Sequence, residues 1–323
     1  MSTLKVPSSL PSAKDDATQI HKAFKGLGCD AGIIINILAH RNATQRDNIQ
    51  QEFETMYSYE LKKGLSSELH GHLKKAILLW MQNPLERDLS TLRQSLTGPI
   101  VELKAATEVI CSRSSSQIRQ IKQAYTPTYG TQLEYDVDAH TSGNHKQLML
   151  AYLSTTRYEG PEIDRVLVEN DVKTIHKYGD RKAGMDEKIL IQVFSERSRA
   201  HLVALDSTYQ KVYGKELRRA IKREASGHFK HGLLTILQCA ENPAKYFAMM
   251  LRKAMKGLGT KDTTLIRIII TRTEVDMQKI KDEYQKLYKK SLIDAVHSET
   301  LDVIFPLIFK EETWNIILVI VSV

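Results

Sequence analysis

Residues 255–299 read MKGLGTKDTTLIRIIITRTEVDMQKIKDEYQKLYKKSLIDAVHSE, and the spacing within this stretch recurs three more times along the chain. Counted from Arg272, an aliphatic residue follows after eight positions, an aromatic after twelve, a tyrosine after sixteen, a leucine after twenty and an acidic residue after twenty-seven. The other copies start from Arg41, Arg113 and Arg197. In copy order the columns are Ile49, Ile121, Leu205, Ile280; Phe53, Tyr125, Tyr209, Tyr284; Tyr57, Tyr129, Tyr213, Tyr288; Leu61, Leu133, Leu217, Leu292; and Glu68, His140, Glu224, Glu299.

Steps of four residues along one side of the chain are typical of α-helices. The anchor arginines recur every 72, 84 and 75 residues, which is too long for a two-helix repeat and fits several short helices per copy. We therefore predict an all-α chain of four repeats with about five helices each. The predicted boundaries are 14–85, 86–156, 157–244 and 245–323, the last with an atypical tail.

The fourth copy predicts helices at 243–256, 262–272, 274–287 and 291–297, and the first three copies end in one more apolar helix, at 73–81, 146–153 and 229–238. Thr260 or Asp262 is expected to cap the helix at 262–272. The apolar face of the helix at 274–287 is predicted to hold Met277, Ile280, Tyr284 and Leu287.

Composition favours a globular, cytoplasmic protein. Hydrophobic residues make up 42% and charged residues 26%, as in ordinary soluble domains. Residues 1–14 lack the apolar segment of a secretory signal, and no uncharged apolar stretch reaches the roughly 18 residues of a membrane-spanning helix. Three cysteines without a Cys-x-x-Cys spacing indicate a reducing compartment.

The net charge of +8 predicts attraction to acidic surfaces. The basic residues are scattered and no nucleic-acid-binding motif is recognisable. We therefore expect anionic lipid as the partner rather than nucleic acid.

Two glycine loops carry the predicted site chemistry. Gly26-Leu27-Gly28 and Gly257-Leu258-Gly259 lie at the same place in copies one and four, and a glutamate follows the first glycine of each by 42 residues, Glu68 and Glu299. Paired glycines allow several backbone carbonyls to converge, and Ca²⁺ accepts carbonyls together with a bidentate carboxylate. A tight interhelical turn would also use such a loop, but the equal separation in two copies favours calcium.

Four repeats, the K-G-L-G loops and the delayed acidic residue together resemble an annexin. His40-Arg41-Asn42, Ile77-Leu78-Leu79-Trp80 and Arg157-Tyr158-Glu159-Gly160 more closely resemble plant annexins. The resemblance covers residues from about 14 to 300. It implies a slightly curved disc with calcium loops on its convex face, mostly monomeric in solution.

The same resemblance implies calcium-dependent, peripheral docking on acidic phospholipid, in which calcium bridges loop carbonyls and a lipid phosphate. The carry-over assigns the metal ligands as Phe24, Gly26, Gly28 and Glu68 in copy one, and Met255, Gly257, Gly259 and Glu299 in copy four.

Copies two and three depart from the pattern. Copy two lacks the glycine loop and has His140 in the acidic column, so we expect no calcium there, because neutral imidazole is a poor ligand for this ion. Copy three lacks the first glycine but keeps Glu224, 42 residues after Lys182. Lys182, Gly184 and Glu224 are therefore candidates for a weak site.

The carboxyl end also departs from the pattern. Pro306 falls where the last helix is expected, and a proline inside a helix costs roughly 3 kcal/mol. Residues 316–321 have the composition of a sticky strand. We therefore predict a less stable fourth copy with a poorly supported Glu299.

Enzymatic alternatives rest on three residues. His40 lies in a segment that has been compared with a peroxidase haem ligand in plant annexins, and Cys111 and Cys239 fall where plant annexins carry a cysteine pair with proposed redox roles. A structural histidine and small buried hydrophobic side chains are the simpler interpretations. Nucleotide hydrolysis lacks its G-x-x-x-x-G-K-[ST] motif here.

The sequence leaves further roles open. Ile266-Arg267-Ile268 resembles a short actin-binding tripeptide, which would add actin as a partner. A calcium-permeable membrane conductance, a role in stress response and a helical scaffold for other proteins are the remaining alternatives.

Overall fold

A computed structural model describes Leu4, residues 11–25, 28–179, 187–256 and 261–301, and Ile320, with the backbone alone at 178, 179 and 299–301. Over these residues the chain forms α-helices and no strand, as the repeat pattern predicts. The helices are α1 (Ala13–Ala23), α2 (Ala31–Ala39), α3 (Ala43–Tyr57), α4 (Leu61–Glu68), α5 (Gly71–Trp80), α6 (Pro84–Thr97), α7 (Leu103–Ser112), α8 (Ser115–Tyr129), α9 (Leu133–His140), α10 (Gly143–Ser154), α11 (Arg165–Gly179), α12 (Glu187–Glu196), α13 (Arg199–Tyr213), α14 (Leu217–Glu224), α15 (Gly227–Glu241), α16 (Pro243–Met255), α17 (Asp262–Thr273), α18 (Met277–Tyr288) and α19 (Leu292–Leu301).

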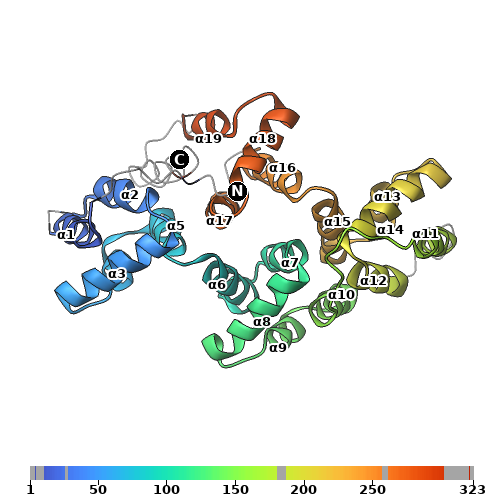
Figure 1. Cartoon of the computed structure of the whole chain (residues 1–323), viewed down its shortest axis with the longest axis horizontal. Coiled ribbons are helices and arrows are strands. Elements are labelled where there is room, and N and C mark those ends of the chain that lie inside the picture. Colours follow the sequence, from blue (N-terminus) through green and yellow to red (C-terminus); the bar gives the residue numbers. More distant parts are fainter. Residues whose placement is uncertain are drawn as a thin grey trace. The chain divides into compact units, whose positions relative to one another are not determined.

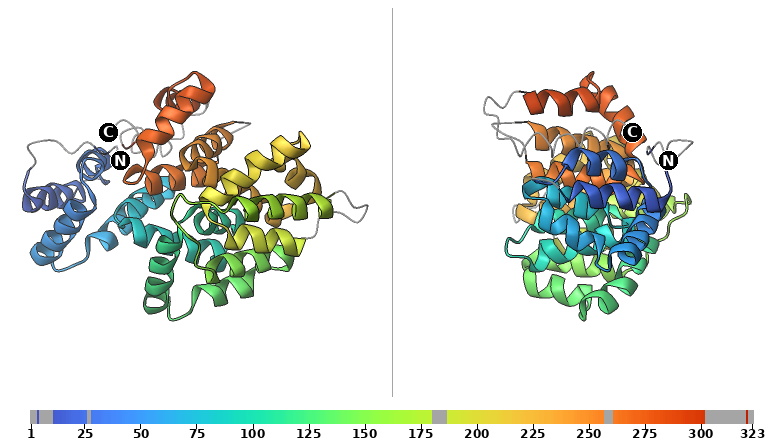
Figure 2. Two further views of the ribbon diagram at one scale, coloured as in Figure 1. Left: turned by 45° about the vertical axis from the view of Figure 1, so that its right-hand side comes forward. Right: turned by 90° about the vertical axis from the view of Figure 1, so that its left-hand side faces the viewer.

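The chain divides into two compact units. Unit 1 comprises Met1–Arg87 and Phe247–Val323, and unit 2 comprises Asp88–Tyr246. Within unit 1, α1 packs against α2 and α3, and α5 packs against α4 and α17 (Figure 1). Within unit 2, α7, α10 and α15 lie side by side, and α13 and α14 also contact α15 (Figures 1 and 2). Unit 1 therefore combines copies one and four, and unit 2 combines copies two and three.

The repeated columns form the core of each copy. The residues eight, twelve and twenty positions after each anchor arginine are all at most 3% exposed. The tyrosines at position sixteen are only partly buried, and each stacks at the edge of the aromatic residue four positions before it, with ring centroids about 5 Å apart. Positions eight, twelve and sixteen thus follow one side of α3, α8, α13 and α18, and the leucine at position twenty begins the next helix of each copy.

Two details of copy four differ from the prediction. The helix expected at 274 begins at Met277, because the N–H groups of Val275 and Asp276 both donate to the Arg272 carbonyl at 3.0 Å and form a tight turn. Leu287 is 37% exposed, whereas Met277 and Tyr284 are fully buried. At 100° per residue Leu287 lies about 80° from Met277, at the edge of the apolar stripe.

The capping prediction for α17 was wrong. Lys261 is the N-cap and makes no side-chain capping bond, while Asp262 is the first helical residue. The carboxylate of Asp262 still interacts favourably with the positive N-terminal end of the helix dipole. Its Oδ2 lies 3.6 Å from His72 Nε2. Thr260, Pro306 and residues 316–321 lie outside the described residues, so the predictions on the tail stay predictions.

Each anchor arginine is held by a buried acidic partner in the first three copies. Arg41 Nε lies 2.7 Å from Asp16 of α1, Arg113 Nε lies 2.6 Å from Asp88 of α6, and Arg197 Nε lies 2.7 Å from Asp171 of α11. The pair joins the first helix of a copy to the end of its second helix. Such a buried pair needs good geometry to offset desolvation, and all three arginines donate two hydrogen bonds to their aspartate.

Copy four replaces this arrangement. Phe247 stands at the aspartate position, and the guanidinium of Arg272 lies 4.4 Å from the centre of its ring. Arg272 pairs instead with Asp276, with Nη2 2.6 Å from Oδ2. A cation–π contact and a local ion pair thus take the place of the pair between helices.

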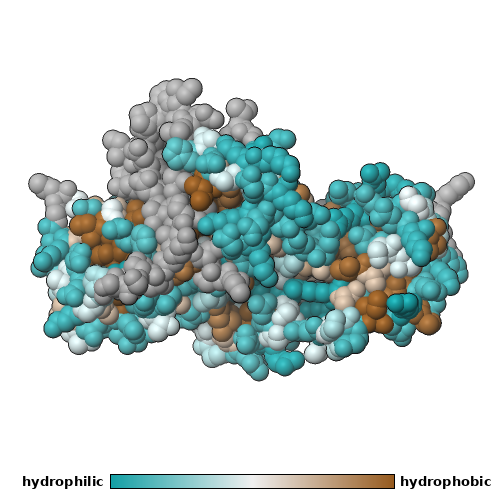
Figure 3. All heavy atoms as spheres, turned by 45° about the horizontal axis from the view of Figure 1, so that its top comes forward, coloured by the Kyte–Doolittle hydropathy of each residue, from teal (hydrophilic) through white to brown (hydrophobic). Residues whose placement is uncertain are grey.

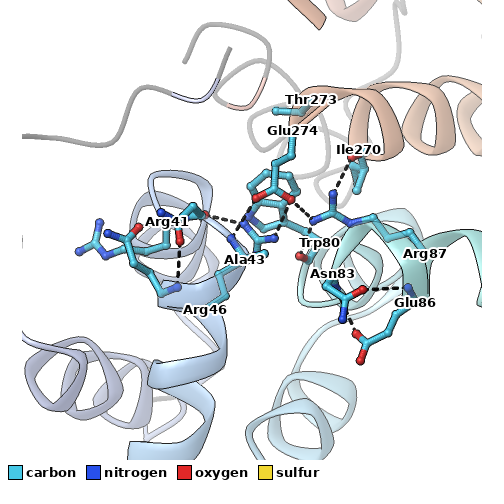
Figure 4. Close-up of polar contacts among 12 residues, drawn as sticks. Arg41, Ala43, Arg46, Trp80, Asn83, Glu86, Arg87, Ile270, Thr273 and Glu274 are labelled. Carbon is cyan, nitrogen blue, oxygen red and sulfur yellow. Dashed lines mark hydrogen bonds and ion pairs between the residues drawn. The ribbon is translucent and has the colours of Figure 1, made fainter. Parts of the chain in front are cut away.

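A buried cluster joins copies one and four inside unit 1 (Figure 4). Glu274 accepts from Arg46 Nη2 at 3.0 Å and lies 2.8 Å from Arg87 Nη2. Both guanidinium groups lie over the ring of Trp80, at 3.9 and 4.7 Å from its centre. Glu274 also accepts from the Ala43 N–H at the start of α3, at 2.9 Å. One carboxylate therefore pairs with two buried cations and accepts from the first N–H of a helix.

We predict that Glu274→Gln lowers the free energy of unfolding of unit 1 by about 3–5 kcal/mol, because it leaves two buried arginines without a counter-charge. Urea unfolding measures the change. Glu60→Gln is the matched control, since the Glu60–Lys63 pair is exposed and such pairs contribute about 1 kcal/mol or less. Equal losses in the two variants would contradict the importance of the buried cluster.

None of the described helices is long and apolar enough to cross a membrane. On the face shown in Figure 3, the described surface is mostly hydrophilic, with small separate hydrophobic patches.

Candidate calcium-binding loops

The loop of copy one connects α1 to α2. Its two ends are tied together because the Asp30 N–H donates to the Ala23 carbonyl at 3.0 Å. Gly28 has φ +98°, a conformation that side chains disfavour, which explains a glycine at this position. Asp30 caps α2 by accepting from the Ile33 N–H at 3.2 Å. Gly26 lies outside the described residues.

Glu68 ends α4, which lies beside this loop. One turn earlier, Gly64 is packed so closely that an added Cβ would stand 2.9 Å from the Phe24 ring. The Glu68 side chain is exposed, and within the described part of the chain it has no hydrogen bond or ion pair. The structure therefore packs the helix that ends at Glu68 against Phe24, at the start of the predicted carbonyl loop.

The exposed donor set suits a hard cation. Among the described residues, the carbonyl oxygens of Phe24 and Gly28 accept no hydrogen bond, so both are available as ligands. Calcium prefers oxygens of this kind, and a carboxylate supplies the negative charge that neutral carbonyls lack. Phe24, Gly28 and Glu68 therefore fit a calcium ion chemically.

Copy four closes its loop in the same way. The Lys261 N–H donates to the Ala254 carbonyl at 2.8 Å, which matches the bond between Asp30 and Ala23. Met255 ends α16 and is 1% exposed. Glu299 lies in α19 by its backbone, but its side chain, Gly257 and Gly259 are outside the described residues.

Copy two keeps the closed loop without the site. The Glu102 N–H donates to the Ser95 carbonyl at 2.9 Å, yet the loop contains Pro99 and Ile100, and Ile100 is 77% exposed. His140 Nδ1 lies 2.9 Å from the Asp136 carbonyl oxygen of its own helix. The same closure thus occurs in copies one, two and four, and copy two differs from the other two in its loop residues and in the histidine at the acidic position.

In copy three, Glu224 is partly buried and forms an ion pair with Arg223. This cation would compete with a metal for the carboxylate. Lys182 and Gly184 lie outside the described residues, so the weak third site stays a prediction.

Comparisons with known proteins agree with this repeat geometry. The sequence profile of the annexin family matches residues 15–80, 87–152, 170–236 and 246–303. The chain is 60% identical to annexin D5 of Arabidopsis thaliana over 300 residues, which cover 93% of this chain and 95% of that protein. This chain belongs to the annexin family. Its resemblance to a plant annexin is confirmed.

Solved annexins share the fold. Chicken annexin V in complex with Zn²⁺ is similar with a TM-score of 0.90 and 31% identity, covering 99% of this chain and 98% of that chain. Calcium-bound annexin (Sm)1 is similar with a TM-score of 0.76 and 26% identity, covering 98% and 93%. Annexins bind phospholipid in a calcium-dependent way and are generally not enzymes.

The residues behind the enzymatic alternatives have structural surroundings. His40 is the C-cap of α2, and its Nδ1 lies 2.7 Å from the Asn36 carbonyl oxygen. Cys111 and Cys239 are each 1% exposed, and Cys111 Sγ lies 3.9 Å from Met149 Sδ. Burial raises the pKa of the Cys111 thiol, which disfavours the reactive thiolate. These surroundings favour the structural interpretations.

Sequence reasoning missed the acidic partners of the anchor arginines. Asp16, Asp88 and Asp171 precede their arginines by 25, 25 and 26 residues, so a column search before the anchor would have found them. It also missed a histidine cluster in unit 2, where His145 and His228 have ring centroids 5.4 Å apart.

His145 is 7% exposed, and its Nε2 lies 2.8 Å from Thr107 Oγ1 on α7. Burial, followed by the charges of His228 and His231 on α15, lowers the pKa of His145 to about 4. His145 and His228 line a cavity of about 270 Å³, and Glu187 and Glu224 line the same cavity.

We predict that this histidine makes unit 2 less stable in acid. An unfolded histidine has a pKa near 6.5, so the unfolded chain binds an extra proton as pH falls from about 6.5 to 4, and stability is lost over that range. The expected loss is about 3 kcal/mol. His145→Gln should remove that part of the pH dependence in urea unfolding, while exposed His70→Gln should not. An unchanged slope in His145→Gln would refute the assignment.

Proposed function

We propose that this annexin binds Ca²⁺ in copies one and four and thereby docks on acidic phospholipid as a peripheral membrane protein. The observation that supports the proposal is the packing of the helix that ends at Glu68 against Phe24, at the start of the closed loop of copy one. The calcium-bound state of annexin (Sm)1 and the Zn²⁺ complex of chicken annexin V support a metal-dependent role by relationship.

Each residue of the site has a defined part. Phe24, Gly26 and Gly28 donate carbonyl oxygens, and Glu68 supplies the one formal negative charge. A bound calcium ion contributes an open coordination position that a lipid phosphate oxygen can fill. The hydrogen bond from Asp30 to Ala23 holds the loop ends together, so less conformational entropy is lost when the carbonyls converge.

Copy four repeats the arrangement through Met255, Gly257, Gly259 and Glu299. Its support in this chain is the equivalent loop closure at Lys261 and Ala254. Lys182, Gly184 and Glu224 would form a weaker third site, because Arg223 already holds Glu224.

We predict that Glu68→Gln raises the calcium concentration needed for liposome binding by about tenfold, because the amide removes the only charge of a carbonyl cage. Glu224→Gln is the matched variant and should change the midpoint less. Cosedimentation with liposomes over a calcium titration measures both midpoints. Equal midpoints for the two variants would contradict the assignment of copy one as the better site.

We further predict that binding requires both Ca²⁺ and anionic lipid and weakens with added salt. Calcium bridging provides the specific contact, and the net charge of +8 adds an attraction that salt screens over about 8 Å at physiological ionic strength. Binding is measured on liposomes with and without an acidic lipid, each with calcium or with a chelator. The comparison separates calcium bridging from the attraction of the net charge. Strong calcium-free binding at neutral pH would favour a purely basic surface instead.

The enzymatic, actin-binding and conductance alternatives remain hypotheses, without a structural observation in their favour. In the tripeptide at 266–268, Ile266 and Ile268 are 3% and 0% exposed, so an actin contact there would need the helix to move. Stoichiometric haem incorporation that His40→Ala abolishes would support the peroxidase alternative.

A further inference from the structure

A small cavity lined by arginines lies in unit 2, where copies two and three meet. Its volume is about 130 Å³, room for several waters or one tetrahedral oxyanion. Four arginines line it, together with Tyr152, Glu159 and neighbouring residues. The arginines are Arg113, Arg157, Arg197 and Arg199. This concentration of guanidinium groups around one cavity raises the question of what balances their charge.

Two of the four arginines are already neutralised. Arg113 and Arg197 each donate two hydrogen bonds to an aspartate, Asp88 and Asp171. They add positive potential to the cavity, but most of their donors are used.

Arg157 is a buried cation without an acidic partner among the described residues. It is only 8% exposed, and its Nη1 donates to backbone carbonyls, including that of Tyr152 at 2.7 Å. Its guanidinium lies 3.5 Å from the centre of the Tyr152 ring. Nη2 is buried and has no hydrogen-bond partner. An unsatisfied buried donor of a charged group is costly, so a ligand that accepts from it would be favoured.

Arg199 is the second arginine with donors to spare. It is exposed, and its one described hydrogen bond runs from Nη2 to the Ser112 carbonyl at 2.7 Å. Glu159 also lines the cavity, but its two oxygens accept from the Ser116 N–H and hydroxyl. These bonds lower the pKa of Glu159. Glu159 therefore stays ionised; it faces the start of α8, and the charge of Arg199 also lowers its pKa. Arg157, with its unbonded Nη2, is thus the arginine of this cavity without an acidic partner among the described residues.

The equivalent positions in unit 1 show how an acidic residue can pair with such arginines. Counted from the anchor arginines, Glu274 occupies the position of Arg199, and Arg87 occupies the position of Glu159. In unit 1 the acid and the base at these positions pair at 2.8 Å inside the buried cluster. In unit 2 the two charges are exchanged. Arg199 stands where unit 1 has the Glu274 carboxylate, and Glu159 stands where unit 1 has Arg87.

We propose that this cavity binds a phosphate-type oxyanion, inorganic phosphate or a phosphate monoester, between Arg157 and Arg199. The anion takes the place that the Glu274 carboxylate fills in unit 1. Guanidinium groups match the geometry of a phosphate through paired N–H donors, and such charge-assisted bonds are the stronger kind. The site is separate from the calcium loops and does not depend on them.

Calorimetric titration of the whole protein with inorganic phosphate, in chelator and without lipid, tests the proposal. A parallel titration uses glycerol phosphate, and chloride at equal ionic strength is the blank. We expect one anion per chain. Binding of both compounds identifies a monoester as an acceptable ligand, whereas binding of inorganic phosphate alone identifies the free ion.

Arg199→Gln should weaken binding by about tenfold or more, since it removes one charged donor. Arg157→Lys keeps the positive charge but loses the planar, paired N–H donors of the guanidinium group, and should weaken phosphate binding as well. The exchange Glu159→Arg with Arg199→Glu copies the charges of unit 1 without changing the net charge, and should abolish binding.

Arg219→Gln is the matched control, because this arginine of unit 2 is 79% exposed and does not line the cavity. It should leave the affinity unchanged. Absence of binding in the parent protein, or equal losses in Arg199→Gln and Arg219→Gln, would overturn the proposal. A folded double-exchange variant that still binds phosphate would overturn it too.

Discussion

The buried ion pair between an anchor arginine and an aspartate sets the geometry of each of the first three copies. In copy one it joins α1 to the end of α2 through Asp16 and Arg41, which are 2.7 Å apart. The two helices are consecutive and joined by a short loop, so the pair fixes one end of them while the loop closes the other. A carbonyl loop can then be held at a defined place, because its supporting helices cannot slide. Losing one partner of such a buried pair would leave an uncompensated charge.

Copy four holds its anchor arginine by other contacts. Arg272 lies over Phe247 and pairs locally with Asp276, and the turn that brings Asp276 into place also releases Glu274 from the helix. Glu274 is thereby free to cross to copy one and neutralise Arg46 and Arg87. The loss of one aspartate thus accompanies the cluster that unites the two copies of unit 1. At the equivalent positions the two units carry opposite charges, Glu274 and Arg87 in unit 1 and Arg199 and Glu159 in unit 2.

The sequence was sufficient for the parts of the fold that depend on local periodicity. The residues eight and twelve positions after each arginine are buried on one face of a helix, because helical geometry decides which residues share a face, whereas the leucine at position twenty begins the next helix. Spacing also predicts Glu68 as a calcium ligand, and the structure packs its helix against Phe24 through Gly64. Leu287 is more exposed than its neighbours on the predicted face because it lies at the edge of the apolar stripe. The cap of α17 was predicted incorrectly because it depends on the exact residue at which the helix begins.

The amino-acid sequence by itself determined the repeat, the helices, the family and the candidate calcium ligands. Each of these depends on short spacings along the chain that recur from copy to copy. Only the tertiary structure decided which residues neutralise the anchor arginines, which copies form one compact unit, and where arginines gather without enough carboxylates. Arg46 and Glu274 are more than two hundred residues apart, and no periodicity links them. Their contact arises when copies one and four pack together and exclude water, so that each buried charge must find a partner from another part of the chain.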